Sequence, residues 1–141
     1  MSDYSEYTDE QLMLMFKNRD KEAFNELVRR YGYSKFTDEQ TIFMFQDGDE
    51  KAYNELVFRY KDKLLNFIIG FMRDYEMSQN LVQDTFMKLY THKHSYKEIA
   101  KFSTWIYTIA GNFAKTELRK TKRRKTYATS ELVFDEREFI I

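Results

Sequence analysis

The sequence predicts an all-α protein, a compact helical bundle with an extra helical hairpin at its N-terminus. Proline is absent from the 141 residues and glycine occurs only four times, whereas strands joined by tight turns usually need more of both. Apolar residues also recur near the helical period of 3.6 along most of the chain. The length fits about one domain that can bury its own core.

Several classes of protein are disfavoured by composition. The chain has no cysteine, so a disulfide framework, a thiolate metal site and a cysteine nucleophile are all excluded. Its first ten residues, MSDYSEYTDE, are acidic and polar, unlike a signal peptide. No apolar run approaches the ~20 residues of a membrane span. We therefore expect a cytoplasmic protein without a membrane span.

Residues 8–31 and 37–60 are two copies of one sequence. They read TDEQLMLMFKNRDKEAFNELVRRY and TDEQTIFMFQDGDEKAYNELVFRY, and 14 of their 24 positions are identical. Each copy opens with Thr-x-x-Gln, the capping-box pattern that begins a helix. Asp20 and Asp49 are suited to cap a second helix. Each copy therefore predicts two helices separated by a break, at 18–20 in the first copy and at 47–49 in the second.

The duplication has three interpretations. Two copies are too few for a solenoid, which normally needs three or more. The first copy can be a hairpin that adds packing surface, or the two near-equivalent copies can compete for one docking position. The third interpretation is an engineered duplication.

The two copies are followed by different sequences. Gly32 breaks the first copy, and the residues up to 36 are expected to form a linker. The second copy continues without a breaker to residue 72. It predicts a long core helix whose apolar face comprises Ala52, Leu56, Tyr60, Leu64, Phe67 and Phe71.

Residues 75–90 predict a further helix. Its expected buried stripe comprises Leu81, Val82, Thr85, Phe86 and Leu89. Residues 91–100, THKHSYKEIA, are polar and interrupt the helical pattern. His92 and His94 lack the acid or cysteine partners of a metal site, so we expect no metal there. Such a loop is suited to contacts with bases or phosphates.

The segment 101–125 is strongly basic, although the formal charge of the whole chain is zero. It holds eight lysines and arginines against one acid, Glu117. Its apolar residues recur at helical spacing at Phe102, Ile106, Ile109 and Phe113. We expect a helix from residue 102 or 103 to near Arg124 that begins in the core and ends in cations. Its partner would be a nucleic-acid backbone. The acidic tail, 126–141, is expected to be a short amphipathic helix, a disordered segment or a truncated interdomain linker.

Three sequence blocks together resemble a known family. They are TDEQ-x5-QDGDEKAYNELVFRY, MSQNLVQDTFMKLY and FSTWIYTIAGNFAKTELRK. In this order and spacing they resemble the second conserved region of bacterial extracytoplasmic-function sigma factors, over residues 37–125. The expected organisation is a duplicated hairpin over 1–34, the region 2-like domain over 35–125 and the tail. No pattern for the family's C-terminal helix-turn-helix domain is found, so we expect a fragment or a natural short form.

The resemblance implies two binding surfaces. The family binds the clamp helices of the largest subunit of RNA polymerase and the melted minus-ten promoter element. The implied polymerase contacts are Asn80, Gln83, Asp84, Met87 and Lys88, although the family usually has an acid at the position of Asn80. The loop 92–101 would receive a base turned out of the non-template strand. The implied DNA contacts are His94, Ser95, Tyr96, Lys97, Lys101, Ser103, Thr104, Trp105, Thr108, Asn112, Lys115, Arg119, Lys120 and Arg123.

Two details of this implied DNA surface stay open. Trp105 can pack into the core or stack on a base. Thr108 and Gly111 stand where the family commonly has basic residues, which lowers the expected affinity for DNA.

We therefore expect a promoter-recognition module and not an enzyme. The sequence shows no Ser/His/Asp arrangement, phosphate loop or recognisable pair of catalytic acids, and it implies no cofactor. The alternative is a sigma-like regulator that binds polymerase or an anti-sigma factor without opening DNA. A generic helical DNA-binding protein is the third possibility.

Overall fold

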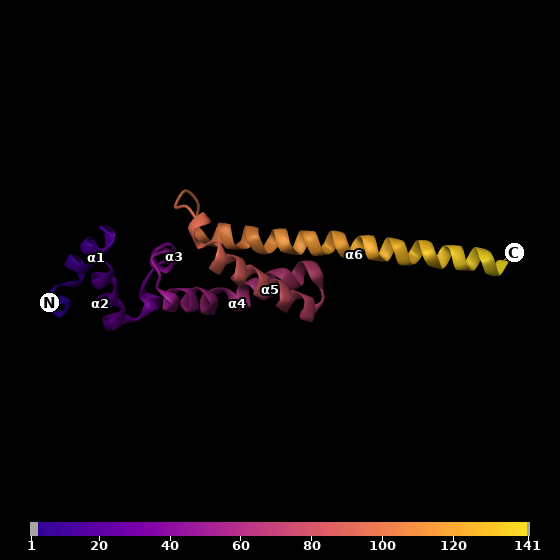
Figure 1. The fold of residues 1–141 in the computed structure, drawn as a ribbon. Coiled ribbons are helices and arrows are strands. Elements are labelled where there is room, and N and C mark those ends of the chain that lie inside the picture. Colours follow the sequence, from indigo (N-terminus) through magenta and orange to yellow (C-terminus); the bar gives the residue numbers. More distant parts are fainter. Residues whose placement is uncertain (1–2, 141) are drawn as a thin grey trace. The chain divides into compact units, whose positions relative to one another are not determined.

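The structure is a computed structural model that describes the backbone of residues 3–140 and the side chains of residues 3–127. All regular structure in this part of the chain is helical, as predicted (Figure 1). The α-helices are α1 (Asp9–Lys17), α2 (Lys21–Tyr31), α3 (Asp38–Gln46), α4 (Glu50–Met72), α5 (Tyr75–Thr91) and α6 (Phe102–Ile140). Three short 3-10 helices are η1 (Tyr4–Glu6), η2 (Tyr33–Lys35) and η3 (Lys93–Ser95).

The chain forms two compact units. The first comprises Met1–Arg59 with Lys93–Phe102, and the second comprises Tyr60–His92 with Ser103–Ile141. Helix α4 therefore contributes residues to both units. No helix in the described part of the chain combines the length and hydropathy needed to span a bilayer.

The helix boundaries in the two repeat copies are set by short capping patterns. Thr8 and Gln11 form a complete capping box at α1, and Thr37 and Gln40 form the same box at α3. These reciprocal hydrogen bonds satisfy backbone N–H groups that have no partner in the first turn of a helix. Asp20 accepts from the backbone at the start of α2, and Asp49 does so at the start of α4. The four predicted caps are confirmed.

The prediction of a linker after Gly32 is wrong, because residues 33–35 fold into η2 and begin the second copy. The Tyr33 hydroxyl donates to Asp49 Oδ2 at 2.7 Å. In the first copy, the Tyr4 hydroxyl donates to Asp20 Oδ2 at 2.9 Å. Each tyrosine thus holds the aspartate that caps the next helix. The structural repeat includes η1 and η2, and the predicted domain boundary after residue 34 falls inside η2.

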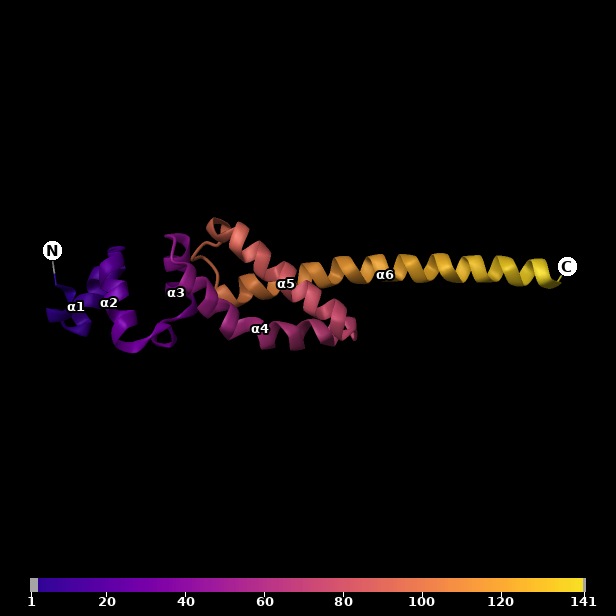
Figure 2. The same cartoon turned by 60° about the horizontal axis from the view of Figure 1, so that its bottom comes forward.

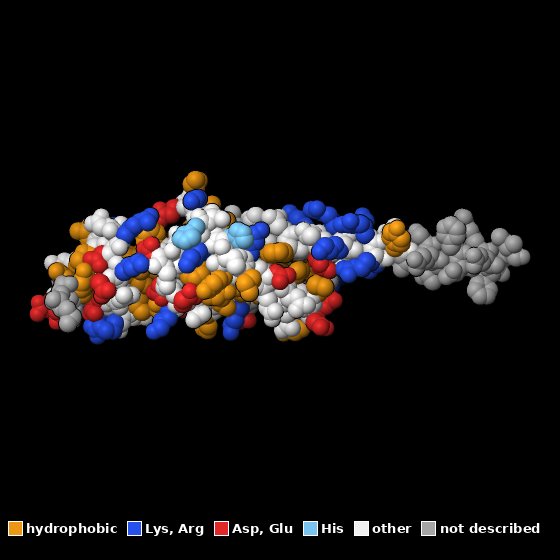
Figure 3. All heavy atoms as spheres, viewed as in Figure 1, with side chains coloured by type: hydrophobic (Ala, Val, Ile, Leu, Met, Phe, Trp, Pro, Cys, Tyr) orange, Lys and Arg blue, Asp and Glu red, His pale blue; other side chains and the backbone are white. Residues whose placement is uncertain are grey.

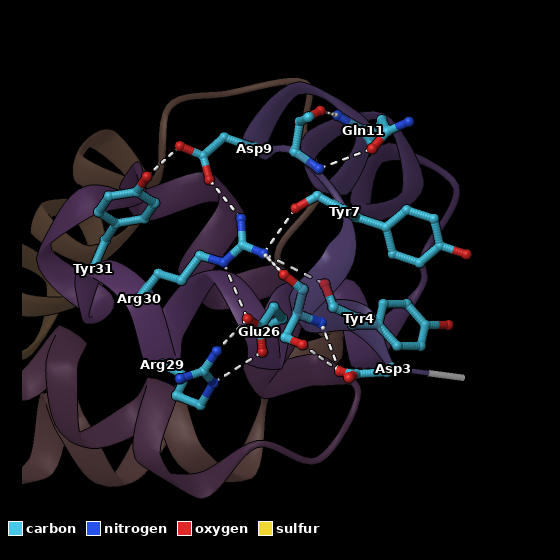
Figure 4. Close-up of polar contacts among 11 residues, drawn as sticks. Asp3, Tyr4, Tyr7, Asp9, Gln11, Glu26, Arg29, Arg30 and Tyr31 are labelled. Atoms are coloured by element: carbon cyan, nitrogen blue, oxygen red, sulfur yellow. Dashed lines mark hydrogen bonds and ion pairs between the residues drawn. The ribbon is translucent and has the colours of Figure 1, made fainter. Parts of the chain in front are cut away.

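A half-buried arginine holds each copy together. The guanidinium of Arg30 donates to Asp9 at 2.8 Å and to Glu26 at 3.0 Å, and it also binds backbone carbonyls of η1 and Tyr7 (Figure 4). Arg59 makes the equivalent bonds to Asp38 and Glu55, both at 2.9 Å, and to the carbonyl of Tyr33 at 2.7 Å. Arginine suits this role because its planar fork donates in several fixed directions at once.

The first copy packs on the second through aromatic side chains. Phe16 and Phe24 of the first copy lie 6.1 Å and 4.7 Å, ring centre to ring centre, from Phe36 of the second. Phe16 also meets Phe43 edge to face at 6.1 Å. Phe16, Phe24 and Phe36 are buried. This contact fits the interpretation that the first copy adds packing surface.

In the second unit, the C-terminal part of α4, α5 and the first part of α6 share one core (Figure 2). The predicted stripe of α5 is buried, from Leu81 to Leu89. The prediction for α4 is partly wrong. Ile68 is fully buried, whereas Phe67 is half-buried and Phe71 is 43% exposed. The buried positions continue in steps of four along α4, so Ile68 takes the place that was assigned to Phe67.

Helix α6 begins at Phe102, as predicted, but it does not end near Arg124. It continues to Ile140, since no proline or glycine follows Gly111 in the sequence. Phe102, Ile106 and Ile109 are buried as predicted, and Phe113 is half-buried. The last fully buried residue in its described part is Ala114. The side chains of the acidic tail lie outside the described residues.

Candidate nucleic-acid interface

One face of α6 is polar and exposed, opposite the face that enters the core of the second unit. Helical geometry, with about 100° between successive residues, places the exposed residues of this face within a sector of roughly 80°. We call this sector the α6 face. It comprises Thr108, Asn112, Lys115, Arg119 and Arg123, all of which are exposed. Lys and Arg side chains gather on the described part of α6 (Figure 3).

The cations of the α6 face are not neutralised by the protein. Among the described residues, Lys115, Arg119 and Arg123 make no ion pair, whereas Arg124 bonds to Glu117 at 2.9 Å on the other side of the helix. Lys120 is also exposed and makes no ion pair with the described residues, but it lies about 60° outside this sector. The N–H groups of these side chains are therefore available to an anionic ligand.

Polar residues continue along α6 toward its N-terminus. Thr104 is exposed, and Ser103 and Trp105 are half-buried. The Thr108 hydroxyl donates to the Thr104 carbonyl at 2.7 Å. The half-buried position of Trp105 is compatible with both interpretations of this residue. Gly111 is buried, and a Cβ added to it would lie 3.9 Å from the ring of Phe67.

The loop before α6 belongs to the first unit and is fixed by Gln46 of α3. The Gln46 amide donates from Nε2 to the carbonyls of Lys93 at 2.8 Å and Tyr96 at 3.2 Å. Lys93 itself reaches back to the carbonyl of Phe45 at 3.3 Å. The loop therefore has a defined shape, although its sequence is polar. Sequence analysis did not single out Gln46, whose only signal is that the matching residue of the first copy is lysine.

The predicted contacts of this loop divide into two groups. His94, Ser95, Lys97 and Lys101 are exposed. Tyr96 is only 4% exposed, its ring meets Phe102, and its hydroxyl donates to the Ala100 carbonyl at 2.7 Å. Burial accordingly raises the pKa of the Tyr96 hydroxyl. Because its ring is part of the core, a contact of Tyr96 with DNA stays a prediction.

The predicted polymerase contacts lie on the exposed face of α5. Asn80, Gln83, Asp84, Met87 and Lys88 are all exposed, and we call this row the α5 face. Met87 is 63% exposed, so this face includes an apolar side chain among its polar residues. The Lys88 ammonium lies 5.6 Å from the ring centre of Phe113, so this cation is positioned by α6.

The two histidines make no metal site in the described structure. His92 Nδ1 lies 2.8 Å from the Thr91 hydroxyl, and His94 is exposed. Among residues 3–127, whose side chains are described, no group of three or more histidine, aspartate or glutamate side chains could hold an ion.

Comparison with known proteins finds sigma factors. A family model described as Sigma-70 region 2 matches residues 56–124. The RNA polymerase sigma-H factor of Pseudomonas aeruginosa is 33% identical over 131 residues, which are 93% of this chain and 52% of that protein. The ECF RNA polymerase sigma factor SigM of Bacillus subtilis is 33% identical over 60 residues, which are 43% of this chain and 36% of SigM. The chain thus spans about half, or less, of the curated relatives it matches.

A solved structure of a sigma factor domain is also similar to this chain. It is the NMR structure of an engineered region 2 of sigmaE in complex with GTAAAA. This domain is 37% identical in sequence, with a TM-score of 0.58, and the match covers 64% of this chain and 94% of that one. The resemblance expected from the sequence is confirmed. The chain belongs to the sigma-70 region 2 family, and one of its named relatives is an ECF sigma factor.

Proposed function

We propose that the chain carries the promoter-recognition domain of an alternative sigma factor. In this role it binds the clamp helices of the largest subunit of RNA polymerase and the melted minus-ten element. Family membership supports the role, and so does the complex of a related region 2 with the oligonucleotide GTAAAA. The domain acts by binding, and catalysis belongs to the polymerase.

The observation that carries the proposal is the unneutralised α6 face. Three cations along one face of a helix can follow the phosphates of a strand, and the counterions they release drive binding. Thr108 and Asn112 on the same face offer hydrogen bonds to sugars or bases. The first turns of α6 are fixed in the core by Phe102 and Ile106, which anchors the end of this face that carries Thr108.

Base recognition would belong to the loop directly before α6. His94, Ser95 and Lys97 present hydrogen-bonding groups to solvent, while Gln46 holds the loop backbone in place. A base turned out of the stack is read through such groups, at a cost of a few kcal/mol for its unstacking. The cation-rich α6 face then supplies affinity with little sequence information.

Polymerase binding would use the α5 face. Asp84 makes no ion pair with the described residues, and Met87 offers exposed apolar area beside it. A carboxylate next to a flexible apolar side chain suits a basic, amphipathic helical partner.

Two uncharged positions of α6 favour one alternative. Thr108 and Gly111 carry no charge where the family commonly has cations, so a regulator that binds polymerase or an anti-sigma factor without opening DNA is the second candidate.

Binding of a labelled single strand containing GTAAAA separates the two functions. Fluorescence anisotropy across a salt series should show strong salt dependence and weaker binding of the duplex form. The promoter-recognition function fails if the single strand does not bind while a polymerase clamp-helix fragment does. A generic DNA-binding function requires the duplex to bind at least as well as the single strand.

A further inference from the structure

A groove in the first unit joins the extra hairpin to the loop before α6. It consists of two adjoining hollows of about 340 Å³ and 280 Å³, and both are lined by Arg19, Glu39, Phe43 and Glu98. We call it the Arg19 groove. One end reaches Lys17 of α1, and the other reaches the loop residues His94 and Lys97. The size lies at the lower end of small-ligand sites.

Arg19 occupies the centre of this groove in an unusual backbone conformation. Its φ is 67°, in the left-handed region, and the matching residue of the second copy is Gly48 at φ 104°. Left-handed backbone is rare for a residue with a side chain and occurs preferentially at functional positions. The guanidinium carbon lies 4.4 Å from the ring centre of Phe43. Its plane is thus held over an aromatic ring, within reach of the groove.

The N–H groups of Arg19 are not used by the protein. Its side chain makes no hydrogen bond or ion pair with any described residue, although Glu39 and Glu98 line the same groove. Gln46 also has a polar group that is not used by the described residues. Its Nε2 donates to two loop carbonyls, and no described donor bonds to its Oε1. Arg19 and Gln46, which carry these unused donors and this unused acceptor, line the same hollow.

The chemistry of the groove selects its ligand. The two carboxylates disfavour a bare anion, such as free phosphate, inside the groove. A flat, neutral ring with donors and acceptors at its edge fits the guanidinium plane of Arg19 and the polar rim. Lys17 and Lys97 at the two ends can receive phosphates on either side of such a ring. These are the features of one nucleotide within a single strand.

We propose that the Arg19 groove binds one base of single-stranded promoter DNA, stacked on the Arg19 guanidinium. The extra N-terminal hairpin thereby becomes part of the recognition surface, together with the loop 93–98. The proposal rests on the proposed function, because the strand that the loop reads must also supply this base.

Three variants test the role of Arg19. Arg19→Gly removes the side chain and installs the residue that the second copy has at the matching position, so the backbone is not strained. Arg19→Lys keeps the charge but lacks the planar group that stacks. Arg29→Gln is the control, since it removes one charge from the same hairpin at an exposed site that lines a different hollow.

The measurement is the affinity for a single strand in which GTAAAA is flanked on both sides, with 2-aminopurine placed at each position in turn. Stacking of a base is worth about 1–3 kcal/mol, so Arg19→Gly and Arg19→Lys should each weaken binding about fivefold or more. Arg29→Gln should stay within about twofold. At one position, the 2-aminopurine fluorescence should change on binding to the wild type and not on binding to the two Arg19 variants. Thermal melting should show that all three variants are folded.

Three results would overturn the proposal while leaving promoter recognition intact. The first is an Arg19→Gly variant that binds as tightly as Arg29→Gln. The second is an Arg19→Lys variant that binds like the wild type, since charge alone would then suffice. The third is a 2-aminopurine fluorescence change that is the same with wild type and Arg19→Gly at every position. Failure of the wild type to bind the strand at all would instead overturn the proposed function.

Discussion

Replacing Arg119 and Arg123 together by alanine should reduce the salt dependence of single-stranded DNA binding. Both residues lie on the α6 face and make no ion pair with the described residues. Each lost contact between a cation and a phosphate lowers the slope of log K against log salt by about 0.7 for a single strand. The pair should therefore lower the slope by about 1.4.

The matched control is Arg124→Ala with Lys125→Ala. These residues are neighbours of the first pair and carry the same charge, but helical geometry places them roughly 100° or more from the centre of the α6 face. Arg124 is also bound to Glu117. The control should change the slope of log K against log salt by less than about half of the change expected for one phosphate contact. The reason is that neither side chain can reach the phosphates of the strand that binds the α6 face.

Anisotropy titrations of the labelled strand at several salt concentrations give the two slopes. Circular dichroism should show unchanged helix content, because alanine is the strongest helix former and both pairs gain two alanines. Equal slopes for the two double variants would refute the assignment of the α6 face, since net charge rather than position would then set the affinity.

Three further predictions concern stability and the α5 face. Gly111→Ala should raise the free energy of unfolding by about 0.5–1 kcal/mol in urea titrations. The added Cβ would lie in ordinary contact with Phe67, at 3.9 Å. A loss of stability would mean that the core beside α6 has no room for this methyl group. The pKa of the Glu26 carboxyl is lowered from its ordinary 4.5, first by the hydrogen bond from Arg29. The ionised Glu26 carboxylate therefore stabilises the fold above pH 4.5, and this stabilisation is lost as the pH falls below that value. Glu26→Gln should make the free energy of unfolding depend less on pH in the acid range. An unchanged pH dependence would contradict this. Asp84→Arg should weaken capture of a polymerase clamp-helix fragment roughly tenfold or more and leave single-stranded DNA affinity within about twofold, whereas equal losses in both assays would argue against a separate α5 face.

Features set by local patterns were predictable from the sequence. The capping boxes at Thr8 and Thr37 depend on four consecutive residues, and each was found as expected. The buried stripe of α5 follows from helical periodicity, because its two faces differ sharply in polarity. The exposed residues of the α6 face were predictable for the same reason.

Features that depend on distant neighbours were not predictable. The turn η2 exists because Tyr33 reaches Asp49, 16 residues further along the chain. Tyr96 was expected at the surface of a polar loop, but the ring of Phe102 and a carbonyl acceptor at Ala100 bury it. In α4, helical periodicity allows either Phe67 or Ile68 to face the core, and tertiary packing determines which of the two is buried.

The end of α6 was not predictable for a different reason. The cation cluster up to Arg124 predicts the end of the helix, but charge alone does not terminate one. No glycine or proline follows Gly111, so the backbone has no local signal to stop. The helix accordingly continues through the cluster to Ile140.

The most direct test of the central claim is to map the single strand GTAAAA on the isotope-labelled protein by backbone amide chemical shifts. The account predicts large shifts in the loop 92–101 and along α6 from Thr104 to Arg123, with the α5 face unaffected. Shifts concentrated on α5, or confined to residues outside the loop and α6, would contradict it.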